Sequence, residues 1–182
     1  KCKQHLTVAM NQYRQKPDVA VYYTNPRGSA YREEFVVFQD EWLTYEFSPR
    51  NWDTNDIRGL IISDSPVASK QDYILYHFKK ALDTGAIDGI YFDCMYMLPN
   101  YDIISGGAYL DDEGKLRPAY DLLQYRELVR RCAILTYKER KGMNNIAHMT
   151  QNQLPAITGW CGINLDWEDK YGVDDFQDRF SR

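Results

Sequence analysis

The chain has 182 residues, of which 44% are hydrophobic and 26% are charged, a balance typical of a globular domain with a sizeable core. Its net charge of −4 and the lack of any basic cluster argue against a nucleic-acid partner. No apolar run approaches the roughly 20 residues that a membrane-crossing helix needs, so we expect no membrane span.

Short apolar runs alternate with helical patterns along the chain. Five runs are predicted strands, at residues 19–25, 59–64, 88–93, 144–150 and 161–169. Helices are expected over 1–15, from Ser69 to Gly85, and from Pro118 to about Lys141, with a short helix inside the aromatic segment 33–47 and a last helical turn near the C-terminus. A long loop is expected over 94–116.

The second predicted helix has the clearest pattern. Ser69 followed by an acid three residues later indicates its start. Ile74, Phe78 and Leu82 then recur at intervals of four, which places them on one helix face. In the third helix, Pro118 suits the first turn because proline lacks the N–H that is unpaired there.

Strands that alternate with helices indicate parallel βαβ units, and uniformly apolar strands are expected when both faces of a sheet are covered. An open doubly wound sheet and a (β/α) barrel both fit this pattern. Long, polar strand-to-helix loops and short helix-to-strand turns favour the barrel. The absence of a GxGxxG or Walker motif after any strand argues against the nucleotide-binding open sheets.

A complete barrel of this kind needs about 250 residues, more than the chain has. We therefore expect an α/β fold of the (β/α)8 TIM type that is incomplete, with about five βα units and the N-terminal strands missing. Residues 1–182 would form a single domain, the C-terminal portion of a larger barrel. Its open sheet edge would need cover from self-association or from the remainder of a parent chain.

Polar side chains stand near the ends of the predicted strands, where a barrel has its active site. Acids gathered beside aromatic rings differ in protonation, so one can act as general acid and another as nucleophile or base, as in glycoside hydrolysis. For any one acid, a purely structural role at the strand end is an equal alternative. The predicted catalytic residues are Asp93, Glu168 and Asp166, and the predicted substrate-binding residues are Tyr23, Asp64, Tyr91, His148, Trp160 and Trp167.

Other chemistries fit the sequence less well. It contains no GxSxG or HExxH motif, and its four cysteines form no CxxC pair, which argues against a zinc site and a disulfide framework. Cys94 adjoins Asp93, whose charge would raise the pKa of the thiol and make it a poor nucleophile. An oxygen-preferring metal ion among the acids is an alternative, but no spacing indicates one. We expect neither a metal nor a cofactor.

Four segments are distinctive: "GAIDGIYFDCMY" (85–96), "GAYLDDEGKLRPAYDLLQYRELVRR" (107–131), "NNIAHMTQNQLPAITGW" (144–160) and "NLDWED" (164–169). Together, in this order, they resemble a family of bacterial glycoside-hydrolase-like proteins of unknown function. The family is similar to the catalytic barrel of β-N-acetylgalactosaminidases. The resemblance implies a carbohydrate substrate, a strand-tip acid at Asp93, an acid pair at Asp166 and Glu168, and a periplasmic or extracellular location in a bacterium.

One position departs from this pattern. The related galactosaminidases carry an adjacent Asp-Glu pair that orients the substrate's own N-acetyl group, whereas here Cys94 follows Asp93. Two interpretations follow. In the first, the chain is a glycosidase domain that hydrolyses glycosidic bonds with another pair of carboxylates. In the second, it is a non-catalytic carbohydrate-binding or assembly module on a barrel scaffold.

Overall fold

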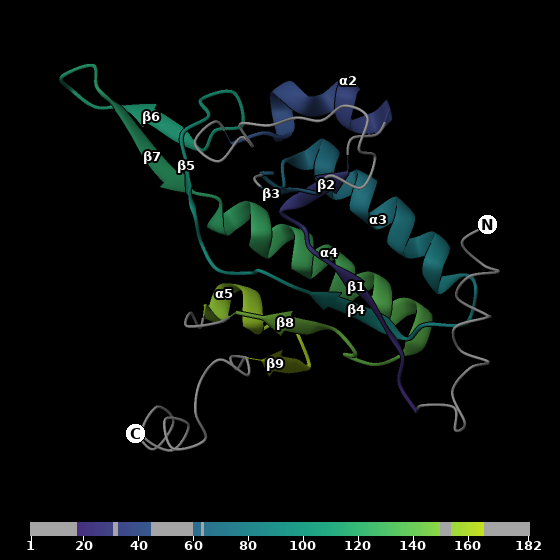
Figure 1. Cartoon of the computed structure of the whole chain (residues 1–182). Helices are drawn as coiled ribbons and strands as arrows, with labels where there is room; N and C mark the ends of the chain where they lie inside the picture. The colour runs from purple at the N-terminus through teal and green to yellow at the C-terminus, as the bar shows by residue number, and fades with distance from the viewer. Residues whose placement is uncertain (1–17, 31–32, 45–59, 63, 150–153, 166–182) are drawn as a thin grey trace, which may run out of the picture.

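A computed structural model describes residues 18–30, 33–44, 60–62, 64–149 and 154–165. The fold is mixed α/β, and its centre is a four-stranded parallel sheet (Figure 1). The strand order is β1 (Val21–Thr24), β4 (Gly89–Phe92), β8 (Ile146–His148) and β9 (Ile163–Leu165). Each of the five predicted strands therefore contains an observed strand, and four of them form this sheet and run parallel.

Strand β4 lies at the centre of this sheet, and its sequence fits that place. A Cβ atom on Gly89 would lie 2.1 Å from the carbonyl oxygen of Asn144, so only glycine allows this close approach of the segment before β8. Ile90 and Phe92 alternate along the strand and are fully buried, whereas Tyr91 between them points to the opposite face. One face of the strand thus builds the core and the other presents Tyr91.

Two helices cover the core face of the sheet, α3 (Ala68–Leu82) and α4 (Leu122–Arg140). The predicted stripe of Ile74, Phe78 and Leu82 is buried in the main core, which confirms the helical periodicity. Leu128 and Cys132 of α4 join the same core, together with Ile157 of the short helix α5 (Pro155–Thr158).

The start of α3 differs from the prediction. The helix begins at Ala68, with Val67 at the N-cap and no side-chain cap. Ser69 lies inside the first turn, where its hydroxyl accepts a hydrogen bond from Trp42 Nε1 at 2.9 Å and donates one to Glu41 at 2.6 Å. Glu41 and Trp42 end helix α2 (Glu33–Trp42), the expected short helix of the aromatic segment. Ser69 therefore joins α3 to α2.

The predicted strand at 59–64 is not part of the parallel sheet, so its predicted place was wrong. The chain turns back after β1, where the Gly28 N–H donates to the Asn25 carbonyl at 3.0 Å, and forms β2 (Gly28–Ala30). Strand β3 (Leu60–Ile62) pairs antiparallel with β2, and β1 pairs directly with β4. The chain reversal thus places β2 beside β3, a pairing that the sequence pattern did not indicate.

The predicted loop 94–116 and the predicted helix start at Pro118 were also wrong. This region forms a small antiparallel sheet of β5 (Pro99–Asn100), β7 (Leu116–Tyr120) and β6 (Ala108–Leu110), and α4 begins only after Asp121. The Ala119 N–H donates to Gly107 on the β6 side, so the nitrogen of Pro118 faces the other side, beyond the two-residue β5. Proline is tolerated there because no N–H is needed.

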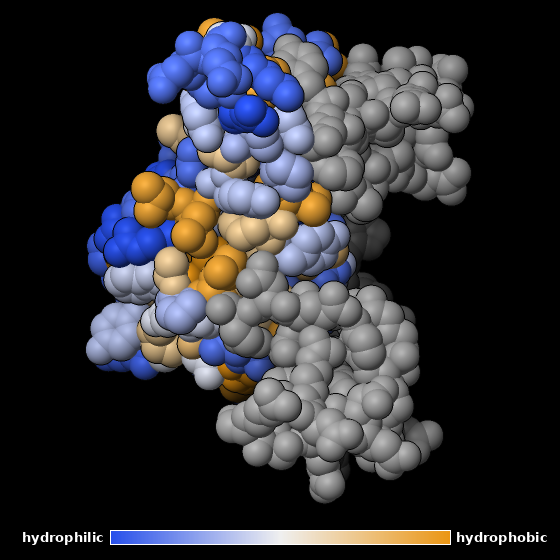
Figure 2. Space-filling view, turned by 90° about the vertical axis from the view of Figure 1, so that its left-hand side faces the viewer, coloured by the Kyte–Doolittle hydropathy of each residue, from blue (hydrophilic) through white to orange (hydrophobic). Residues whose placement is uncertain are grey.

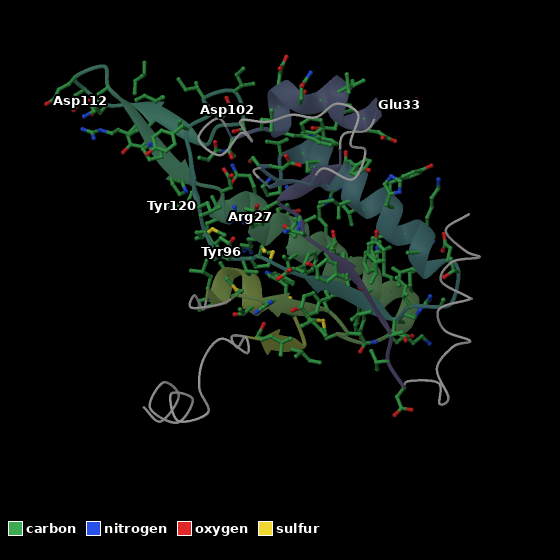
Figure 3. The ribbon with its side chains drawn as sticks, in the orientation of Figure 1. Arg27, Glu33, Tyr96, Asp102, Asp112 and Tyr120 are labelled. Carbon is green, nitrogen blue, oxygen red and sulfur yellow. The ribbon has the colours of Figure 1, made fainter. Side chains whose placement is uncertain are left out.

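We call residues 99–120 the β-arm. It projects from the body of the protein at the same end of the sheet as the carboxyl end of β4 (Figure 1). Asp112 lies at its tip (Figure 3). Seen from the side on which the arm projects, most of the coloured residues at the top are hydrophilic, and a hydrophobic area lies in the middle (Figure 2).

The described residues contain no closed barrel. We expected both faces of the parallel sheet to be covered. Helices α3 and α4 cover one face, but on the other face Tyr23, Ile163 and Leu165 are 60%, 50% and 39% exposed, so this expectation is confirmed for one face only. The predicted helix at 1–15, the predicted last helical turn and the end of the predicted strand 161–169 lie outside the described residues.

Candidate functional site

The carboxyl ends of three neighbouring parallel strands bring four predicted site residues together. Tyr23 of β1 and Tyr91 of β4 are register partners, and Asp93 directly follows β4. His148 is the last residue of β8, the next strand in the sheet. The Asp93 N–H donates to the Thr24 carbonyl at 2.9 Å, which holds the carboxylate beside β1. We call Tyr23, Tyr91, Asp93 and His148 the Asp93 cluster.

The Asp93 carboxylate accepts hydrogen bonds on both of its oxygens. The Tyr23 hydroxyl donates to Oδ2, while His148 Nδ1 lies 3.0 Å from Oδ1 and the Cys94 N–H donates to Oδ1 at 2.8 Å. The exposed fractions of the two side chains are 22% for Asp93 and 9% for His148, so both are partly shielded from water. Shielding strengthens these bonds, because competing water is reduced.

Aromatic rings form a wall along the cluster. The rings of Tyr23 and Tyr91 stack with centroids 5.5 Å apart and planes inclined by 19°, and His148 lies edge-on to Tyr91 at 6.1 Å. Tyr23 is also 60% exposed, so part of its ring is available to a ligand. Exposed aromatic rings beside a carboxylate suit ligands that combine apolar C–H faces with hydroxyl groups.

The hydrogen bond to Asp93 raises the pKa of Tyr23 to about 12, with smaller contributions from burial and from the Asp93 charge. Tyr23 is therefore a neutral donor at neutral pH. Burial, and secondarily the charge of Asp93, also raises the pKa of the Cys94 thiol. A thiol with a raised pKa is a weak nucleophile, in line with the expectation from the sequence.

Asp64 lies in a different environment. Its carboxylate accepts a hydrogen bond from Lys70 Nζ at 2.6 Å, and the side chains of both residues are buried, with exposed fractions of 0% and 2%. The ammonium also lies 4.4 Å from the ring centre of Trp42. Burial lowers the pKa of Lys70, and the nearby Asp64 opposes that shift. Because a ligand cannot reach a fully buried carboxylate, we do not include Asp64 in the candidate site.

The remaining predicted residues are divided between the core and the undescribed end of the chain. Trp160 is partly buried against the main core, with the Arg126 guanidinium 5.8 Å from its ring centre. Asp166, Trp167 and Glu168 lie outside the described residues.

One residue beside the cluster was missed by the sequence analysis. Arg27, in the turn after β1, is only 4% exposed and donates to the Cys94 and Tyr96 carbonyls, just after Asp93 (Figure 3). A single arginine after an Asn-Pro turn resembles any surface arginine in sequence. No local pattern could therefore have identified it.

A surface groove of about 550 Å³ lies elsewhere, between α3 and α4. It is lined by Asp72, Leu75, Tyr76, Lys79, Arg131, Ile134, Leu135 and Lys138. None of these residues is a predicted site residue. The groove therefore provides an internal comparison for any ligand-binding experiment.

A comparison with models of known protein families and with curated proteins finds no match to this sequence. Within the described residues, no three His, Cys, Asp or Glu side chains are grouped so that they could hold a metal ion. None of the helices that the structure describes is both long enough and apolar enough to cross a membrane. The Asp93 cluster is thus the feature from which a function can be inferred.

Proposed function

We propose that this chain is a glycoside-hydrolase-like, carbohydrate-active domain, and that its parallel sheet belongs to an incomplete (β/α) barrel. The observation that carries the proposal is the convergence of Tyr23, Tyr91, Asp93 and His148 at the carboxyl ends of three adjacent parallel strands. Ligands of α/β proteins bind at this edge, in barrels and open sheets alike.

Each member of the cluster has a chemical role in this proposal. The Asp93 carboxylate is the reacting or substrate-orienting acid, and His148 and Tyr23 fix its position through one hydrogen bond each. The Tyr23 hydroxyl donates its hydrogen bond to Asp93, so the lone pairs of its oxygen are left to accept a hydrogen bond from a sugar hydroxyl. The exposed part of the Tyr23 ring, backed by Tyr91, supports the apolar face of a pyranose.

Hydrolysis requires a second carboxyl group, for which Glu168 or Asp166 is the candidate. A protonated acid donates its proton to the glycosidic oxygen as the bond between that oxygen and the anomeric carbon breaks. In an inverting enzyme a water activated by the second carboxylate bonds to the anomeric carbon. In a retaining enzyme the second carboxylate bonds to it first, and a water activated by the first residue then breaks that bond and releases the sugar. A separation of about 5 Å between the two carboxyl groups would indicate retention, and about 6.5–9.5 Å would indicate inversion.

A non-catalytic sugar-binding module is the second candidate, and one observation favours it. Both oxygens of Asp93 already accept hydrogen bonds, from Tyr23, His148 and the Cys94 N–H. A carboxylate held in this way can orient sugar hydroxyls without attacking an anomeric carbon.

Turnover of a panel of 4-nitrophenyl glycosides separates the two candidates. If the chain is a hydrolase, Asp93→Asn and Glu168→Gln should each lower kcat/KM by about 10²–10⁴-fold, the usual contribution of a catalytic acid or base. Asp83→Asn is the matched control, because Asp83 is 56% exposed and pairs with Lys79 on the surface. Full activity in both test variants would overturn the catalytic assignment. Glycan binding by the wild type without turnover would support the binding module.

A further inference from the structure

Arg27 contacts the segment that follows Asp93 through both ends of its guanidinium group. Nε donates to the Cys94 carbonyl at 2.8 Å, and Nη2 donates to the Tyr96 carbonyl. The planar fork of arginine can reach two carbonyls at once, which the single ammonium of lysine cannot do in the same geometry. The guanidinium carbon also lies 5.3 Å and 4.7 Å from the ring centres of Tyr96 and Tyr125. Arg27 therefore binds this segment at several points.

The bound segment has an unusual backbone conformation. Cys94 has a φ of +56°, in the left-handed region that residues other than glycine adopt only at an energetic cost. In this conformation the Cys94 N–H turns back and donates to Asp93 Oδ1 at 2.8 Å. The conformation of Cys94 and the orientation of the Asp93 carboxylate are therefore coupled.

We infer that Arg27 is a positioning residue, which holds Cys94 in its left-handed conformation and thereby keeps the Asp93 carboxylate between Tyr23 and His148. The contacts form a path from the Arg27 guanidinium to the Cys94 carbonyl, and through the Cys94 backbone to its N–H and Asp93 Oδ1. Without Arg27, Cys94 relaxes to a common backbone conformation and Asp93 turns away from Tyr23. The importance of this path for catalysis rests on the proposed function, but the path itself does not.

The pKa of Tyr23 is the appropriate measurement, because its largest perturbation comes from the hydrogen bond to Asp93. Tyrosine labelled with ¹³C at Cζ reports ionisation by NMR, and a Tyr23→Phe variant identifies the Tyr23 signal. In the wild type we expect a pKa of about 12, and in Arg27→Lys a fall toward the ordinary value of 10.0. Arg126→Lys is the matched control, because Arg126 also lies over an aromatic ring, that of Trp160, and should leave the Tyr23 pKa unchanged.

A rescue experiment separates positioning from general stabilisation. In Arg27→Ala, millimolar guanidinium should return the Tyr23 pKa toward the wild-type value, because it can occupy the vacated space and donate to both carbonyls. Urea at the same concentration has a similar shape but no charge and should restore less. The fold of each variant is checked by circular dichroism.

Three results would overturn the inference: a folded Arg27→Lys in which Tyr23 keeps the wild-type pKa, an Arg27→Ala in which guanidinium has no effect, or a failure of both variants to fold even with guanidinium. The last result would mean that Arg27 is needed only for the stability of the fold and has no separate positioning role. The proposed function can fail separately. A lowered Tyr23 pKa in Arg27→Lys, from a protein that binds no glycan, would leave the positioning role intact and remove the carbohydrate assignment.

Discussion

Asp64 and Asp93 are both acids that the sequence places at the end of a predicted strand, yet the structure gives them opposite environments. Asp64 is fully buried and paired with the buried Lys70. Asp93 is partly accessible and hydrogen-bonded to the side chains of Tyr23 and His148. The same residue type in the same pattern thus forms an internal ion pair in one place and a candidate reactive site in the other.

The difference arises from the strand that precedes each acid. Strand β4 belongs to the parallel sheet, so Asp93 emerges at the edge where α/β proteins bind ligands. Strand β3 pairs with β2 instead, and the Asp64 N–H donates to the Arg27 carbonyl at 2.9 Å. Sheet membership, more than the acid itself, therefore decides whether a strand-end carboxylate can reach a substrate.

The largest expected effect is on the buried ion pair. Lys70→Met leaves the Asp64 charge buried without its ammonium partner, so we expect the free energy of unfolding to fall by about 3–5 kcal/mol. Urea unfolding at neutral pH measures this change. Lys79→Met, which breaks the exposed pair with Asp83, is the control and should have little effect.

A double variant tests whether the ion pair or the packing dominates. Asp64→Leu combined with Lys70→Met removes both charges, so it should be clearly more stable than Lys70→Met alone. If the double variant is no more stable, the loss comes from the contacts of the Lys70 ammonium with the rings of Trp42 and Tyr73, and the comparison between the two acids weakens.

A smaller effect on stability is expected at Asp93. In Asp93→Asn, the amide oxygen still accepts from the Cys94 N–H, so we expect a loss of less than about 1.5 kcal/mol. Asp64→Asn, measured by the same urea unfolding, should lose more because the buried Lys70 keeps its charge without a partner. Equal losses in the two variants would mean that Asp93 is as structural as Asp64.

The smallest expected effect is a pH dependence at Tyr23. Its folded pKa of about 12 exceeds the unfolded value of 10.0, so the Tyr23–Asp93 hydrogen bond stabilises the protein fully below pH 10. This contribution is lost as the pH rises toward 12, where the hydroxyl ionises beside a carboxylate. The wild type should therefore exceed Tyr23→Phe in stability at neutral pH, and the difference should shrink between pH 10 and 12. A constant difference across that range would argue against the hydrogen bond.

Much of the parallel sheet could be predicted because its strands are short apolar runs separated by helical patterns. Asp93 and His148 could be proposed as site residues for the same reason, since both stand at the end of such a run. The pairing of β3 could not, because it depends on the chain reversal at Asn25–Gly28 and on the tertiary hydrogen bond from Asp64 to Arg27.

The sequence could not predict the roles of Pro118, Lys70 and Arg27, because each role depends on contacts that form only in the folded chain. Pro118 suits a helix start and equally an antiparallel strand whose nitrogen faces no partner, and the fold of the β-arm decides between them. Lys70 lies six residues after Asp64, a spacing that matches no helical pair, so their ion pair emerges only from the packing of α3 against the β2–β3 segment. Arg27 acts on carbonyl groups 67 and 69 residues away, which no local pattern encodes.

The most direct test of the Asp93 cluster as a carbohydrate site is to find where a sugar binds. Aromatic NMR signals of Tyr23, Tyr91 and His148 would be followed during titration with a panel of mono- and oligosaccharides, with Tyr76 in the groove between α3 and α4 as the internal reference. The account predicts saturable shifts at Tyr23, Tyr91 and His148, abolished by Asp93→Asn, with none at Tyr76. Shifts confined to Tyr76, or no shift at the cluster with any sugar of the panel, would contradict it.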